Sequence, residues 1–246
     1  GIEQQLAPST AFEPGSGSTI MSYAGGCGSD NVQSASDDYY HVGSLDDFYA
    51  FSRKGQGNTC ATIVPTQNRA PVIALKYPKS FAIPVSTPFQ LEASATDADG
   101  DPLTYCWEQY DTGPTTPLGE ASFSSPLFRS FRPNTNPVRT IPRISALVNN
   151  EKDKREVLPA YARKLTFRCT VRDNHPGGAG VVWAQTQFDV TDKAGPFLVT
   201  APTQEGITWI TGSTQTVTWD VAKTDLAPVN CRYVHIRLSV DGGLTY

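Results

Sequence analysis

The sequence predicts a mainly β chain organised as β-sandwiches, preceded by a short helical and loop segment. Apolar and polar residues alternate along 89–93, 103–108, 165–171 and 181–190, which is the pattern of strands with one buried face. The 20 glycines and 19 prolines among 246 residues supply the turns that such strands require. Short strands separated by turn residues at these intervals are typical of two packed sheets.

The first segment, residues 1–61, is short and polar, and we expect it to rest on a neighbouring part of the protein. Ser44 followed by Asp47 resembles the capping box that begins a helix, because both side chains can satisfy free backbone N–H groups. Apolar residues on one side then predict a short helix over 44–51, which ends before Gly55.

Residues 70–193 contain the four alternating stretches and are predicted to form the first sandwich. A long excursion over 111–162, rich in proline, serine and arginine, interrupts it. Loops of this length in a small domain are usually functional or packed on another element, so we expect this insert to cover the first segment. Within the insert, residues 144–148 are expected to form a helical turn.

Residues 195–246 predict a second sandwich that is truncated. Apolar and polar residues alternate along 197–199, 215–220 and 234–240, and the Asp-Gly-Gly sequence at 241–243 is a turn signal. Because so short a stretch provides half of a sandwich at most, we expect the returning strand to be missing and a sheet edge to be left exposed.

Composition narrows the class of partner. With 24 acidic and 20 basic residues the net charge is −4, which disfavours nucleic acid as a partner, since proteins that bind it carry a clustered basic face. No apolar run approaches the roughly 20 residues that span a bilayer, so no membrane span is predicted. The five cysteines include no C-x-x-C pair, which favours disulfides in an oxidising, extracellular compartment over a structural zinc site.

One stretch stands apart from this β pattern. Residues 18–27 hold the sole methionine, Met21, among glycines that permit a tight turn. A lone methionine in such a turn predicts either an apolar plug beneath another element or a side chain that fills a core gap. Residues 20–23, Ile-Met-Ser-Tyr, with their flanks 12–19 and 27–31, resemble the Met-turn of the bacterial secreted, reprolysin-like branch of the metzincin zinc peptidases.

In that family the turn lies beneath a catalytic zinc, and the His-Glu-x-x-His-x-x-Gly-x-x-His motif precedes it. The sequence has three histidines, none of them at that spacing: His41, His175 and His235. The resemblance therefore implies that residues 1–61 are the C-terminal remnant of a metzincin catalytic domain. Met21 and Tyr23 would support the zinc site from below.

The resemblance further implies a secreted parent that hydrolyses peptide bonds. Zinc and the protein or peptide substrate would be bound by a preceding catalytic part of the same polypeptide, which is thus the expected partner of this chain. The chain itself would be a non-catalytic C-terminal region, inactive alone and without zinc of its own. The alternative is an extracellular β-sandwich module for binding or adhesion, without peptidase activity.

The loop at 96–102, Thr-Asp-Ala-Asp-Gly-Asp-Pro, is followed by Leu-Thr-Tyr and is similar to the acidic segment of immunoglobulin-like sandwiches of the cadherin and PKD type. It places three carboxylates together, and a fourth lies in the loop at 172–178: Asp97, Asp99, Asp101 and Asp173. Oxygen ligands of this kind suit Ca²⁺. The alternative is a tight turn held by Asx hydrogen bonds, without an ion.

The peptidase resemblance also pairs Cys27 with Cys60, because in that family a cysteine beyond the helix ties back to the Met-turn. A second bridge, between Cys106 and Cys169, is less favoured. Trp107 is expected to face the core, which turns Cys106 outward, whereas Cys169 is expected to face inward. Side chains on opposite faces of a sheet cannot be bridged.

Overall fold

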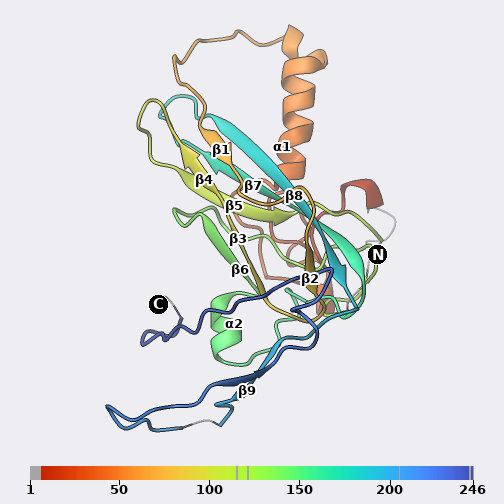
Figure 1. The fold of residues 1–246 in the computed structure, drawn as a ribbon. Helices are drawn as coiled ribbons and strands as arrows, with labels where there is room; N and C mark the ends of the chain where they lie inside the picture. Colours follow the sequence, from red (N-terminus) through yellow and green to blue (C-terminus); the bar gives the residue numbers. More distant parts are fainter. Residues whose placement is uncertain (1–6, 115, 121, 205, 244, 246) are drawn as a thin grey trace.

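The structure, a computed structural model, is mainly β, as the sequence predicts (Figure 1). It describes residues 7–114, 116–120, 122–204, 206–243 and 245. The main sheet has the strand order β2, β8, β7, β5, with β8 antiparallel to β7 and parallel to β2. The bounds of these strands are Ala82–Pro84 for β2, Val181–Thr191 for β8, Arg163–Arg172 for β7 and Thr104–Gln109 for β5.

Two antiparallel pairs of short strands accompany this sheet. β3 (Phe89–Glu92) pairs with β6 (Val138–Ile141), and β1 (Val72–Ala74) pairs with β4 (Ser94–Thr96). Side chains of the main sheet, of the β3–β6 pair and of the insert meet in one apolar core. Its largest members are at most 4% exposed: Leu91, Trp107, Phe128, Ile141, Leu165, Phe167 and Phe188.

The alternating pattern predicted the long strands correctly and failed near the end of the chain. β9 (Leu198–Ala201) and β10 (Thr218–Asp220) form a separate antiparallel pair. The prediction of a strand over 234–240 is wrong. The structure has no strand there and leaves Ile236 and Leu238 65% and 69% exposed. Alternation makes a strand only where a neighbouring strand supplies hydrogen bonds.

The helix of the first segment starts earlier than its capping box suggests. α1 runs over Val42–Tyr49 and continues through a π-helical stretch, Ala50–Lys54, and a 3-10 turn, Gln56–Thr59. His41 is its N-cap, because its Nδ1 accepts a hydrogen bond of 3.1 Å from the N–H of Gly43. Figure 1 shows this helical stretch extending away from the sheets.

The remaining helical elements are short. Two single 3-10 turns, Pro8–Thr10 and Gly28–Asp30, lie in the first segment. The helical turn expected in the insert is confirmed as α2, Ile144–Val148. In the part of the chain that the structure describes, no helix combines the length and the apolar character needed to cross a bilayer.

The insert covers the first segment, as predicted. The hydroxyl of Tyr39 donates a hydrogen bond of 2.7 Å to Ser130 Oγ. The guanidinium of Arg129 donates one of 2.5 Å to Gln33. The backbone N–H of Leu118 donates one of 2.9 Å to Asp30. Polar contacts between residues this far apart in sequence fix the first segment on the sandwich.

Candidate functional site

The turn at Ile20–Tyr23 is held by a single carboxylate. Glu13 accepts hydrogen bonds from the backbone N–H and the hydroxyl of Ser18, at 2.9 and 2.8 Å. Its second oxygen accepts the same pair from Thr19, at 3.3 and 2.6 Å. Ser18 and Thr19 are buried, 0% and 1% exposed. A carboxylate that accepts four hydrogen bonds in a partly buried site stabilises one conformation of the loop.

Glycine allows this loop to pack closely. Gly15 has a φ of +53°, and a Cβ at its position would lie 2.4 Å from the carbonyl oxygen of Asp30. Any other residue would therefore clash as well as adopt an unfavourable φ. The N–H of Tyr23 donates to Ser16 O at 2.9 Å, and that of Ile20 donates to Tyr39 O at 3.0 Å. The base of the turn is thus ordered by backbone hydrogen bonds.

Met21 is exposed, so the expectation that it fills a core gap is wrong. Its exposed fraction is 63%, and those of Ile20 and Tyr23 are 39% and 44%. Met21 and Tyr23 instead line a hollow of about 220 Å³, together with Glu13 and His41. The polar base of the turn is buried while its apolar side chains face outward, so Met21 fills no core gap in this chain.

The first turn of α1 rests on a buried carboxylate of the main sheet. Glu108 in β5 is 0% exposed. One of its oxygens accepts a hydrogen bond of 2.9 Å from the N–H of Val42, and the other accepts one of 2.7 Å from Ser130 Oγ. A negative charge at a helix N-terminus is favoured by the unpaired N–H groups there. The sheet thereby fixes where α1 begins.

A second carboxylate joins α1 to the outer face of the sheet. Asp46 accepts hydrogen bonds from Tyr110 Oη at 2.6 Å and from Trp183 Nε1 at 3.1 Å, and it forms an ion pair with Arg168. The Arg168 guanidinium lies between two rings, 3.4 Å from the Tyr110 centroid and 3.6 Å from the Trp183 centroid. Cation–π contacts and charge complementarity together hold the helix in place.

The sequence analysis did not identify Glu108 and Asp46, the two carboxylates that hold α1 on the sheet. A usable signal was present, because Glu108 and Arg168 occupy strand positions that face away from the core. Glu108 lies two residues after Cys106, which the sequence had placed on that outer face. Charged residues of opposite sign on the outward positions of neighbouring strands indicate a partner above the sheet.

The sheet register explains why two predicted cysteines stay apart. Cys169 lies opposite Trp107 in the β5–β7 pairing and belongs to the core, whereas Cys106 lies opposite Thr170 on the other face. All five cysteines are free, so both proposed disulfides are wrong. For Cys27 and Cys60 the reason is the helix, since the 13 residues of Val42–Lys54 carry the chain roughly 20 Å along its axis.

No protein-family model matches this chain, and no curated protein matches its sequence. The three histidines lie in separate places: His41 is buried with its Nε2 3.8 Å from Glu108, His175 contacts Asp101, and His235 is exposed. Among the described residues, one group of three potential metal ligands lies within 4.8 Å, namely Asp97, Asp99 and Asp101.

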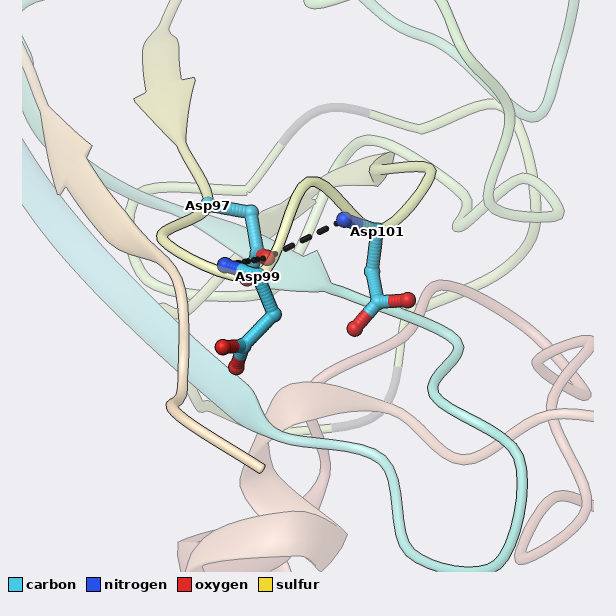
Figure 2. A group of neighbouring side chains, drawn as sticks. All are labelled: Asp97, Asp99 and Asp101. Carbon is cyan, nitrogen blue, oxygen red and sulfur yellow. Dashed lines mark hydrogen bonds between the residues drawn. The ribbon is translucent and has the colours of Figure 1, made fainter. Parts of the chain in front are cut away.

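The acidic loop is a turn built on Asp97. Its Oδ1 accepts hydrogen bonds from the N–H groups of Asp99 and Asp101, at 2.9 and 3.1 Å (Figure 2). This is the Asx-bonded turn that the sequence offered as one alternative. Gly100 supplies the positive φ of 80° within it. Figure 2 shows the carboxylates of Asp99 and Asp101 projecting to the same side of the loop.

Two cationic groups face these carboxylates. Asp99 accepts hydrogen bonds from Arg69, from its backbone N–H and Nε at 2.8 Å each and from Nη2 at 2.5 Å. These hydrogen bonds hold the pKa of Asp99 below its ordinary value. His175 Nδ1 lies 2.7 Å from Asp101 Oδ2, and this hydrogen bond raises the pKa of His175. Part of the negative charge is therefore balanced within the chain.

Asp173 lies near the Asp97–Asp99–Asp101 group but is not one of its members. Its carboxylate accepts hydrogen bonds from Asn68 Nδ2 at 2.8 Å, from the Gly180 N–H at 2.7 Å and from the His175 N–H at 3.1 Å. Burial alone would raise the pKa of Asp173, but these donors hold it below its ordinary value. The oxygens Asp97 Oδ2 and Asn68 Oδ1 are buried and lack a hydrogen-bond partner among the described residues. Two such oxygens beside several carboxylates fit a hard, oxygen-seeking cation such as Ca²⁺.

Proposed function

We propose that this chain is the non-catalytic C-terminal region of a secreted zinc metallopeptidase. In this proposal the Ile20–Tyr23 turn forms the floor of a catalytic site, and the sandwich holds that floor in place. The observation that carries the proposal is the contrast within the turn. Glu13 fixes its base, while Met21 and Tyr23 stay exposed over the hollow.

The contrast has a physical meaning. Ordering a loop costs conformational entropy, here offset by the Glu13 hydrogen bonds. The exposed apolar side chains of Met21 and Tyr23 remain in contact with water in this chain. A preceding part that covered them would bury their apolar surface, which lowers the free energy. A zinc ion held by that part would activate water and polarise the peptide carbonyl. Met21 and Tyr23 would contact the ligands of this zinc from below and keep their orientation.

The decisive experiment uses the complete reading frame. We expect it to encode His-Glu-x-x-His-x-x-Gly-x-x-His upstream of Gly1, and we expect the complete protein to hydrolyse casein with zinc. Met21→Ala should then lower this activity at least tenfold, while Val64→Ala, a change at a 75% exposed apolar residue, leaves it unchanged. A reading frame without the motif would instead favour the binding or adhesion module.

We also propose that the acidic loop binds Ca²⁺. The observation in its favour is a buried oxygen without a partner within the cluster, Asp97 Oδ2. Asn68, beside Asp173, has a second such oxygen, Oδ1. Calcium titration should raise the melting temperature. An ion that binds only the folded state, present at a concentration of 100 times its Kd, adds about 2.7 kcal/mol to the free energy of unfolding. Asp97→Asn should abolish the rise, and Asp225→Asn, at an exposed carboxylate, should not. An equal rise with Asp97→Asn would refute the site.

A further inference from the structure

A second hollow, of about 700 Å³, lies between β5, the β3–β6 pair and α2. Its volume falls in the range of sites for small organic ligands. It shares no lining residue with the hollow beside the Ile20–Tyr23 turn. Two partly exposed aromatic side chains line it, Tyr105 and Phe131, beside the buried Trp107. Aromatic faces of this kind offer a surface on which a flat or apolar ligand can stack.

The charged residues that line this hollow are all positive. They are Arg132, Arg139 and Arg143, and the lining includes no aspartate or glutamate. Arg132 is ion-paired outside the lining with Asp37 and Asp38, at 2.9 Å each. Arg139 is held firmly, with a side chain 10% exposed and Nη2 hydrogen bonds of 2.8 Å to Glu156 and 2.6 Å to the Arg129 carbonyl. Its guanidinium also lies 5.0 Å from the centroid of the Phe131 ring. The positive charge is therefore fixed in position before any ligand arrives.

Arginine and asparagine side chains supply hydrogen-bond donors at this hollow. Arg143 Nε lies 3.4 Å from Asp153 Oδ2 without forming a hydrogen bond, and the Arg143 side chain is 40% exposed. The side-chain oxygens of Asn134 and Asn136 accept from backbone N–H groups at 2.8 and 3.0 Å, which leaves their NH₂ groups as donors.

We propose that this hollow binds an organic carboxylate with an aromatic or apolar body. Guanidinium and amide donors satisfy carboxylate oxygens, and arginine can do so with two parallel hydrogen bonds. The aromatic wall accepts the body of the same ligand. The lining itself carries no carboxylate that would repel this ligand, since the acids paired with the three arginines lie outside it. This assignment stands on different residues from the peptidase proposal and does not depend on it.

The test is calorimetric titration of the intact chain with N-acetylphenylalanine and with its neutral amide. The two probes share the aromatic body and differ in the carboxylate. The acid should bind at least tenfold more tightly than the amide, and more tightly than acetate, which lacks the ring. Tetraglutamate distinguishes a free small acid from an acidic peptide as the source of the carboxylate. Equal affinity for acid and amide, or no binding of the acid, would overturn the proposal.

Two variants test the residues. Arg143→Gln should weaken binding of the acid at least tenfold, whereas Arg53→Gln, at an exposed arginine far along the chain, should leave it unchanged. Asn136→Asp guards against misfolding of the first variant, because Asp retains the acceptor that Val138 N–H uses and only adds negative charge. Asn136→Asp should weaken binding of the acid and leave binding of the amide unchanged. Wild-type affinity in both folded variants contradicts the assignment.

Discussion

The carboxylate of Glu108 accepts a hydrogen bond of 2.9 Å from the backbone N–H of Val42, so a buried residue near the end of β5 determines where α1 starts. The same carboxylate accepts from Ser130 of the insert. One buried group thus connects the first segment, the sheet and the insert. Because water cannot replace these bonds, the loss of this carboxylate leaves donors unsatisfied.

We predict that Glu108→Gln lowers the free energy of unfolding by about 1–3 kcal/mol, because the new NH₂ group faces a donor and leaves it buried without an acceptor. Urea denaturation followed by circular dichroism measures the change. Glu92→Gln, at an exposed position of β3, serves as the matched control and should stay within about 0.5 kcal/mol of the wild type. A Glu108→Gln protein as stable as the control would contradict the role of this residue.

We predict that Asp46→Asn loosens α1 without unfolding the sandwich. The variant loses the ion pair with Arg168 and one acceptor for the Tyr110 hydroxyl. The expected loss is about 1–3 kcal/mol of local stability. Hydrogen exchange of residues 42–54 should accelerate, while that of β7 remains slow. Asp47→Asn changes the neighbouring exposed carboxylate and should leave both rates unaltered.

We predict that Glu13→Gln makes the loop at 13–23 sensitive to proteases. A glutamine side chain offers a donor where Ser18 or Thr19 requires an acceptor, so part of the fourfold hydrogen bonding is lost. Limited proteolysis should cut within this loop before it cuts the sheets. The separate variant Met21→Ala serves as the control and should show the wild-type digestion pattern, because the Met21 side chain is exposed. Identical digestion of all three proteins would show that Glu13 does not hold the turn.

We predict that the acidic loop responds to pH through His175. Its contact with Asp101 raises the pKa of His175 above the ordinary 6.5. A raised folded-state pKa adds stability that is fully present below about pH 6.5 and is lost as pH rises through the folded-state value. Proton NMR titration should therefore give His175 a pKa above 6.5, and Asp101→Asn should lower it. An unchanged titration in Asp101→Asn would refute the coupling.

We predict that a thiol assay divides the cysteines by burial. Cys60 and Cys231 are exposed and should react with Ellman's reagent in the folded protein. Burial raises the pKa of Cys169 to about 12 and also raises that of Cys106, so neither should react before unfolding. Denaturation in urea without reductant should reveal all five thiols. A count of three reactive thiols after denaturation would show instead that one disulfide is present.

Local patterns predicted the sandwich because β7 and β8, its two long strands, alternate apolar and polar residues along the sequence, although β7 is buried on both faces. β7 and β8 follow the alternation expected over 165–171 and 181–190. The short strand β6 escaped notice, because its four residues lie in an insert dominated by proline and arginine and gain their order from β3. Propensity over so few residues is weak beside the tertiary contacts that form such a strand.

The candidate sites were predictable only in part. The acidic loop could be read from the sequence, since its carboxylates are neighbours along the chain. The buried contacts of Glu108 and Asp46 join residues more than sixty positions apart, at sequence separations of 66 and 64, and no local pattern encodes them. The orientation of Met21 also depends on distant residues, because Glu13 and Tyr39 O fix the backbone of its turn.

The stacking of Arg168 between Tyr110 and Trp183 has a practical consequence. The Trp183 indole donates its N–H to Asp46 of α1, so its surroundings change whenever the helix departs from the sheet. Emission from this one indole, isolated by replacing the other three tryptophans with phenylalanine, would act as an intrinsic optical gauge of helix docking. The protein thus carries its own fluorescent probe for the attachment of its first segment.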